Sequence, residues 1–246
     1  MSAPTFPPRA PAGKLTSMEL YLIRHGQSTN NALEDWTQRV EDPLLTERGE
    51  RQAKRAAAHL AAGRHLPPAS MRQDRPPLDR LYVSPMIRAL QTAHPIGSAL
   101  GVVPEVWTDI HEIGGIYLDH GERKVGYPGR PRRELAEHFP HYLLPETLGE
   151  DGWWNRDVES LEEAHARAML VAARLCERAD EDARIALVSH GEFLSALLHA
   201  LARRAPDAGT YFAHHNTGIT HIDLTPRGVV VYYLNRYAHL DDDLLT

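Results

Sequence analysis

Residues 19–26 read Glu-Leu-Tyr-Leu-Ile-Arg-His-Gly, a short apolar run that stops abruptly at a polar Arg-His-Gly. Such a run of strand-forming residues predicts a buried strand. Residues 184–191 repeat the pattern as Arg-Ile-Ala-Leu-Val-Ser-His-Gly. Ligands of open parallel sheets bind at the carboxyl ends of the strands, so His25 and His190 are expected at one binding edge. The pair His120-Gly121 follows no predicted strand, so the strand context, and not the dipeptide, is the informative feature.

Predicted strands and helices alternate along the rest of the chain. Helices are expected over 47–62, 85–100, 160–179 and 192–203, and further strands over 78–83, 102–106, 218–224 and 229–234. In the second helix, Ser84 is the expected N-cap and Pro85 the expected first helical residue. The alternation predicts an α/β fold, a three-layer α/β/α sandwich around a mainly parallel sheet.

A single domain is expected over residues 18–240. Residues 1–17 are rich in proline and lack an apolar signal core, so they are interpreted as a flexible lead-in. Residues 113–157 hold glycines and prolines with weak periodicity, and we interpret them as a cap insertion over the site. Residues 241–246 begin with three aspartates and form an expected acidic tail.

The composition narrows the possible partners and location. The chain has 246 residues, and 27 Lys and Arg against 33 Asp and Glu give a net charge of −6, which disfavours a nucleic-acid binder. No apolar run is long enough for a membrane span. The single cysteine, Cys176, rules out an intrachain disulfide and fits a reducing compartment, so a cytoplasmic location is expected.

Two arginines are expected at the same edge as the two histidines. Arg24 precedes His25 directly, and Arg88 falls in the first turn of a helix that follows a predicted strand. A guanidinium near a helix N-terminus favours anions, and arginine is suited to forked recognition of phosphate. Together with His190, these residues predict a cationic pocket for a phosphoryl group.

Four blocks of the sequence, in order, carry a family resemblance. The blocks are Arg24-His25-Gly26-Gln27-Ser28 with Asn31, Asp42-Pro43-Leu44-Leu45-Thr46 with Gly49, Ser84-Pro85 with Arg88-Ala89 and Gln91-Thr92-Ala93, and Val188-Ser189-His190-Gly191. They resemble the motifs of the histidine phosphatase superfamily, branch 1, which includes the cofactor-dependent phosphoglycerate mutases. The resemblance implies a phosphoglycerate mutase-like fold.

The resemblance implies that His25 attacks phosphorus and carries a phosphohistidine. A neutral imidazole is a competent nucleophile, and the adjacent arginine charge disfavours its protonation. Arg24, Arg88 and His190 would hold the non-bridging oxygens of the phosphoryl group. Gly191, after the second histidine, would let a ligand approach the backbone. No metal is expected if these groups carry the charge.

A general acid must protonate the leaving group from the side opposite His25. The family places this acid before a glycine, and Glu112 in Ile-His-Glu-Ile-Gly matches best. Asp109 and Glu105 are the competing candidates, because the match rests on few residues. Asn31 is a candidate neutral donor to the substrate, or a residue that orders its loop.

The resemblance favours phosphomonoester hydrolysis on a small phosphorylated substrate, without a cofactor. A mutase is the first alternative, although this chain has Asn30 where the family's glycolytic mutases carry tryptophan. A catalytically silent phosphate-binding regulatory module is the second. His214, His215 and His221 match no zinc spacing. Oligomeric state is left open, with a homodimer as one option.

Residues 113–157 hold two further clusters of side chains, and each cluster has two interpretations. Arg130, Arg132 and Arg133 form a solvated face, or meet an anionic substrate. Trp153 and Trp154 line a substrate rim, or anchor their loop in the core.

Overall fold

The computed structural model describes residues 17–67, 75–203 and 209–246. Its main feature is a six-stranded sheet in the order β3-β2-β6-β1-β7-β8. The four strands from β3 to β1 pair in parallel, and β7 and β8 extend the sheet antiparallel. The strands are β1 (Met18–Arg24), β2 (Arg80–Val83), β3 (Pro104–Val106), β6 (Arg184–Ser189), β7 (Ile219–Thr225) and β8 (Gly228–Arg236). The sequence expectation for residues 1–17 falls, except for its last residue, outside the described part.

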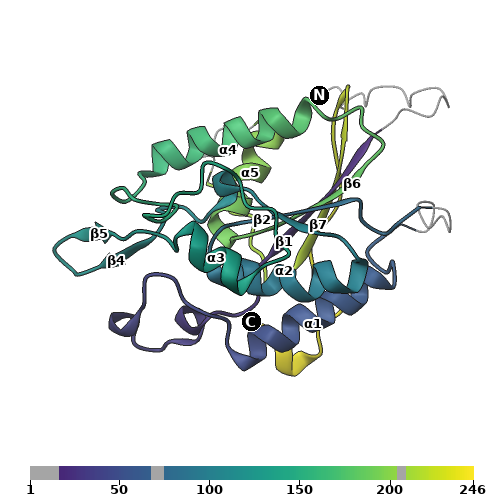
Figure 1. Ribbon diagram of the computed structural model, residues 1–246. Coiled ribbons are helices and arrows are strands. Elements are labelled where there is room, and N and C mark those ends of the chain that lie inside the picture. The colour runs from purple at the N-terminus through teal and green to yellow at the C-terminus, as the bar shows by residue number, and fades with distance from the viewer. Residues whose placement is uncertain (1–16, 68–74, 204–208) are drawn as a thin grey trace.

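Helices cover both faces of this sheet (Figure 1). Residues of β1 alternate between the faces, because Tyr21 and Ile23 pack in one core cluster and Leu20 and Leu22 in the other. The first cluster lies under α1 (Glu47–Ala61) and α2 (Ile87–Leu100), and the second under α4 (Leu161–Cys176) and α5 (Gly191–Leu201). The predicted α/β/α sandwich with a mainly parallel sheet is therefore confirmed.

Two helix starts follow the sequence rules. The Thr46 hydroxyl accepts a hydrogen bond from the Gly49 N–H, 3.0 Å away, and caps α1. Ser160 and Glu163 form a reciprocal capping box at the start of α4.

The start of α2 differs from the prediction. The helix begins at Ile87 with Met86 as N-cap, so the expected cap at Ser84 is wrong. The Ser84 hydroxyl lies 2.7 Å from Nε2 of His190 and accepts the N–H of Met86 at 3.3 Å, so its backbone contact falls before the first helical residue. The carboxylate of Asp42 instead accepts the Ile87 N–H at 3.2 Å, and so caps the helix from a distant loop.

The insertion over 113–157 contains a hairpin of β4 (Tyr117–Asp119) and β5 (Lys124–Gly126), followed by α3 (Arg132–His138). Trp154 is buried, and its ring contacts both Trp153 and His111. A Cβ at Gly115, where φ is +75°, would lie 2.1 Å from the Trp154 ring. The tryptophans therefore anchor this loop by packing.

The arginines of the insertion also serve its own structure. Arg132 donates to the carbonyl oxygens of Leu144 and Pro145. Arg130 pairs with Glu134 in the first turns of α3.

The last residues, 241–246, pack against α1. Arg51 and Arg55 form ion pairs with Asp243 and Asp241, and Leu244 is buried. This segment includes the short 3₁₀ helix η5 (Asp242–Leu244).

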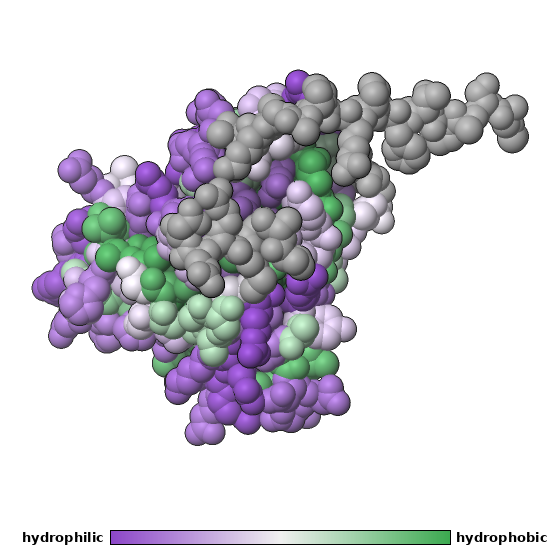
Figure 2. All heavy atoms as spheres, turned by 90° about the vertical axis from the view of Figure 1, so that its right-hand side faces the viewer, coloured by the Kyte–Doolittle hydropathy of each residue, from purple (hydrophilic) through white to green (hydrophobic). Residues whose placement is uncertain are grey.

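Two excursions from the sheet lie on the same side of the molecule (Figure 1). The β4–β5 hairpin and the segment 28–43, with 3₁₀ helices η1 (Thr29–Ala32) and η2 (Trp36–Gln38), lie at the left in Figure 1. The opposite side is mostly hydrophilic with smaller hydrophobic patches (Figure 2).

In the described part of the chain, no helix has the length and apolar character needed to cross a bilayer.

Candidate active site

A pocket of about 270 Å³ opens at the carboxyl ends of β1 and β6, where the sequence predicts a binding edge. Segment 28–43 forms one wall and the start of the insertion another. Six of the predicted site residues line it: Arg24, His25, Asn31, Arg88, Glu112 and Gly191. The seventh, His190, lies directly behind His25, with 5.0 Å between the ring centroids.

Hydrogen bonds fix the tautomer of His25. Its Nδ1 lies 2.6 Å from the carbonyl oxygen of Gly26, which can only accept, so Nδ1 carries the proton. Nε2 then presents a lone pair, which accepts from Nε of Arg88 at 3.2 Å. Burial, followed by the charges of Arg88 and Arg24, holds the pKa of His25 well below its ordinary value. The ring is therefore neutral at neutral pH, as a nucleophile requires.

The loop that carries His25 is held by residues of the other sequence blocks. The N–H of Gly26 donates to the Thr92 hydroxyl at 2.9 Å, and the N–H of Leu45 donates to the Gln91 side chain. A Cβ at Gly26 would lie 2.6 Å from the Gly49 carbonyl oxygen. Glycine is thus required at Gly26 by the close approach of α1, and not by a ligand.

His190 is fully buried beside His25. Its Nε2 lies 2.7 Å from the Ser84 hydroxyl, and its buried Nδ1 has no hydrogen-bond partner among the described residues. Burial, with the nearby Arg88 and His25, holds the pKa of His190 well below its ordinary value. A neutral His190 with an unsatisfied ring nitrogen is suited to bind a phosphoryl oxygen.

Arg24 and Arg88 flank the histidines. Nη1 of Arg24 donates to the carbonyl oxygen of His214 at 2.7 Å, which orients the guanidinium. Nε of Arg24 is buried and has no hydrogen-bond acceptor within residues 17–67, 75–203 and 209–246. Arg88 reaches His25 from the second residue of α2, in the first turn, as the sequence predicts.

Glu112 lies at the N-terminus of α5. Its Oε1 accepts from the N–H of Phe193 at 2.9 Å and of Ile113 at 3.0 Å, so it caps the helix that begins at Gly191. Burial, followed by the charge of Glu192, raises the pKa of Glu112 above its ordinary value despite these bonds. A carboxyl group with a raised pKa at the pocket wall can hold and donate a proton.

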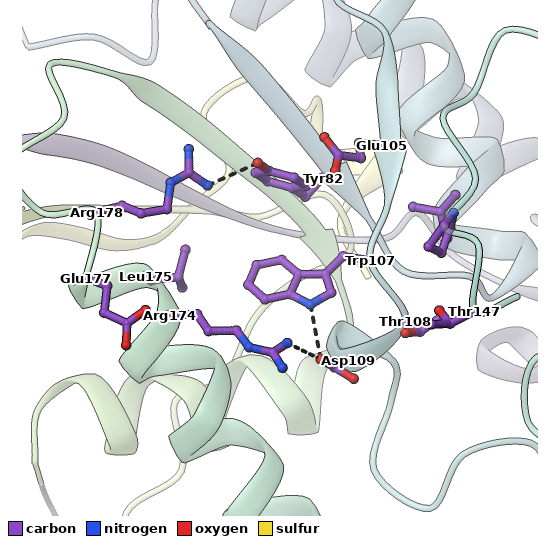
Figure 3. A pocket seen from close by; sticks show the side chains of 12 residues that line it. Tyr82, Glu105, Trp107, Thr108, Asp109, Thr147, Arg174, Leu175, Glu177 and Arg178 are labelled. Carbon is purple, nitrogen blue, oxygen red and sulfur yellow. Dashed lines mark hydrogen bonds and ion pairs between the residues drawn. The ribbon is translucent and has the colours of Figure 1, made fainter.

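The competing acids, Asp109 and Glu105, line a second pocket of about 740 Å³ beside β3 (Figure 3). Asp109 accepts hydrogen bonds from Arg174 and from the indole of Trp107 there. Neither carboxylate lines the pocket of His25. The structure therefore brings Glu112, and not its competitors, to the predicted site.

Asn31 has an observed role within its loop. Its Oδ1 accepts from the backbone N–H of Ser28 at 3.1 Å, and its own N–H donates to the Ser28 hydroxyl in a capping box. The amide also lines the pocket, so both interpretations of Asn31 are compatible with its position. Neighbouring Asn30 bonds to the backbone of Val40 and ties the loop across its base.

A family comparison matches residues 20–236 to the histidine phosphatase superfamily, branch 1. The chain belongs to this superfamily. The resemblance of the four sequence blocks to this superfamily is thus confirmed.

Two known proteins are each similar to part of this chain. The PE-PGRS family protein PE_PGRS11 of Mycobacterium tuberculosis is 33% identical over 108 residues, which is 44% of this chain and 16% of that protein. The Schizosaccharomyces pombe protein named Probable phosphatase SPAC513.02 is 33% identical over 81 residues. These residues make up 33% of this chain and 32% of that protein. The chain therefore matches less than a third of the length of either relative.

A solved structure matches more of the chain. It is a phosphoserine phosphatase from Entamoeba histolytica in complex with 3-phosphoglyceric acid, with a TM-score of 0.58 and 21% identity. The match covers 91% of this chain and 100% of that chain, and it shows the shared fold.

The sequence interpretation missed the outer wall of the pocket beside His25. Trp36 and Tyr211 are 66% and 59% exposed and line the mouth with Arg39 and Tyr117. They lie on three separate segments, and an isolated tryptophan in a polar loop was the only signal for any of them.

The histidines considered as metal ligands do not gather. His214 binds the Thr220 hydroxyl through Nε2, His215 lies near the carbonyl of Thr246, and His221 stacks on Tyr21. Across the described ranges, no three His, Cys, Asp or Glu side chains are placed to hold a metal ion.

Proposed function

We propose that the protein hydrolyses phosphomonoesters through a phosphohistidine on Nε2 of His25. The observation that carries this proposal is a buried, neutral imidazole whose Nε2 accepts from Arg88, in a pocket that Arg24 also lines. The shared superfamily and its phosphatase members support phosphatase chemistry of this kind. The substrate proposed is a small phosphorylated molecule, because the pocket volume is about 270 Å³.

In the first step, Nε2 of His25 attacks phosphorus while the ester P–O bond breaks. The Nε–H of Arg88, which donates to Nε2 in the free protein, turns to a phosphoryl oxygen when the substrate enters. Arg24 and the unsatisfied Nδ1 of His190 bind the other non-bridging oxygens. Glu112 gives its proton to the leaving oxygen, so that an alcohol and not an alkoxide departs.

In the second step, water attacks the phosphohistidine. Glu112, now ionised, takes a proton from the water as the new P–O bond forms and the P–N bond breaks. Inorganic phosphate leaves, and His25 returns to its neutral form. Gly191 and Asn31, at the pocket wall, contact the substrate in this proposal.

The alternatives predict different products. A mutase delivers the phosphoryl group to a second hydroxyl, and a silent binding module forms no product. The combination of a nucleophile at His25 and an acid at Glu112 supports an enzyme, because binding alone requires neither. We also propose a cytoplasmic location, because a chain with the single cysteine Cys176 fits a reducing compartment.

Hydrolysis of p-nitrophenyl phosphate tests the proposal. The wild-type protein should release nitrophenol and phosphate, and His25→Ala should abolish the release. Unchanged hydrolysis by His25→Ala would overturn the assignment of the nucleophile. Adding an alcohol acceptor separates the alternatives, since phosphate as the main product supports a hydrolase and a phosphorylated acceptor supports a mutase.

A further inference from the structure

A buried carboxylate, Asp42, lies behind the phosphoryl-binding edge and has no part in the proposed chemistry. Its side chain is 7% exposed. Oδ1 lies 3.7 Å from Nη1 of Arg88, and Oδ2 lies 3.7 Å from Nε of Arg130. The same carboxylate accepts the N–H of Ile87 at the start of α2. Asp42, which lies in the loop before α1, thus contacts both the helix that carries Arg88 and the insertion.

We infer that Asp42 is a positioning residue, which fixes the guanidinium of Arg88 and links the 113–157 insertion to the phosphoryl-binding edge through Arg130. The inference rests on the proposed function in one respect, that Arg88 binds the phosphoryl group.

The Arg88 guanidinium is held at two of its nitrogens. Its Nε donates to Nε2 of His25, and its Nη1 faces Asp42. A guanidinium is planar, so two contacts on different nitrogens define both its position and its orientation. Without Asp42, the contact with His25 is the one polar side-chain contact of Arg88 that remains within the described residues, and that contact must break when a substrate enters.

Arg130 connects the same carboxylate to the insertion. It precedes α3, and its Nη1 pairs with Glu134 one turn along. Its buried Nε has no hydrogen-bond partner among the described residues and lies nearest to Asp42. The insertion, whose first residues form a wall of the pocket, is therefore tied electrostatically to Arg88 through one shared anion.

Asp42 is charged at neutral pH in spite of its burial. Burial raises the pKa of Asp42 to about 6, with a small addition from Glu41, while Arg88, Arg130 and the Ile87 N–H lower it. A charge kept in a buried position depends on its cationic partners, because an unpaired buried charge is costly.

A purely electrostatic role for Asp42 makes the opposite prediction from a positioning role. If Asp42 only reduces the positive potential of the pocket, its neutralisation strengthens the binding of anions. If Asp42 positions Arg88, its neutralisation weakens that binding, because Arg88 must then be ordered when the anion binds. The sign of the change therefore distinguishes the two roles.

The variant Asp42→Asn separates charge from helix capping. The amide keeps an oxygen for the Ile87 N–H and loses the negative charge that faces Arg88. Asp79→Asn is the matched control, because Asp79 also accepts a backbone N–H, from Arg184, and pairs with Arg75, near the amino ends of β2 and β6.

Sulfate is the probe, because it stays a dianion over the working pH range and its binding requires no turnover. We expect calorimetry to show about tenfold weaker sulfate binding for Asp42→Asn, with a similar rise in KM for p-nitrophenyl phosphate. Asp79→Asn should leave both values unchanged. Equal or tighter sulfate binding by Asp42→Asn would overturn the inference.

Arg130 supplies a second test on a more exposed residue. Arg130→Ala should weaken sulfate binding about threefold, and Arg130→Lys should restore part of that loss. The double variant Arg130→Ala with Asp42→Asn should bind sulfate no more weakly than Asp42→Asn alone. Additive losses, or unchanged binding in Arg130→Ala, would contradict the link. Sulfate binding is measured without turnover, so it tests the role of Asp42 separately from the proposed function. A wild-type protein that binds sulfate but hydrolyses no phosphoester would refute the proposed function, and the sulfate comparison of the variants would still test the role of Asp42.

Discussion

Two pockets of this protein differ in how their charged side chains are held. In the larger, beside β3, Asp109 forms an ion pair with Arg174 (Figure 3). Arg178, from the same pocket, forms an ion pair with Glu181. The smaller pocket keeps His25 neutral, with its pKa well below the usual range because of burial and adjacent arginines.

The same contrast applies to the carboxyl groups. Glu112 in the smaller pocket contacts backbone N–H groups and no cation within ion-pair distance among the described residues, and burial raises its pKa. Asp109 in the larger pocket faces Arg174 directly. Pocket size is therefore a poor guide to reactivity. The smaller pocket, and not the larger, holds a histidine and a glutamate whose pKa values are shifted by burial, a feature that is frequent at functional sites.

The largest effect expected within this comparison is that of Glu112→Gln. The amide cannot donate a proton to the leaving group, so kcat/KM for an alkyl phosphate should fall by about 10³-fold. The loss should be much smaller for p-nitrophenyl phosphate, whose leaving group needs less protonation. Steady-state kinetics with the two substrates measure both values.

Equal losses on the two substrates would show that Glu112 is not the acid. Glu105→Gln and Asp109→Asn would then be compared in the same assay, since these acids were the competitors from the sequence.

His190→Ala should have the next largest effect. It removes a ring that lies beside His25 and offers an unpaired nitrogen, so we expect kcat to fall by about 10²-fold. Ser84→Ala is the control, because it removes the hydroxyl partner of His190 and leaves the ring in place. If Ser84→Ala were as damaging as His190→Ala, His190 would act through Ser84 and not on the substrate.

The pH dependence should reflect the two shifted groups. Attack requires neutral His25, whose pKa is lowered, and protonated Glu112, whose pKa is raised. As pH rises through the pKa of Glu112, kcat/KM should fall about tenfold per unit. That alkaline decline should be absent from Glu112→Gln, and its persistence in the variant would assign it to another group.

The smallest effect is expected in the larger pocket. Asp109→Asn breaks an exposed ion pair with Arg174, so kcat/KM should stay within about twofold of wild type. A loss of tenfold or more would mean that the two pockets are coupled.

The fold was predictable where local patterns determine it. The buried runs that become β1 and β6 alternate with helices whose caps, Thr46 and Ser160, obey local rules. The start of α2 was not predictable, because its cap is the side chain of Asp42, 45 positions before Ile87. Local sequence holds no signal for a contact of that separation.

The site divides in the same way. His25 and His190 follow buried strands, so their convergence at one edge could be deduced from topology. Glu112 required the family resemblance, since its contact with the N-terminus of α5 joins distant parts of the chain. The pocket mouth, with Trp36 and Tyr211, depends on the paths of loops that carry no periodic pattern.

Trapping the phosphoenzyme tests the central claim most directly. The wild-type protein, mixed with a phosphorus-labelled substrate and quenched in denaturant within a turnover, should carry label that is stable in alkali and released by acid. Peptide mapping should place that label on His25, and His25→Ala should carry none. Label on another residue, or hydrolysis by the wild type with no labelled protein at any quench time, would contradict the account.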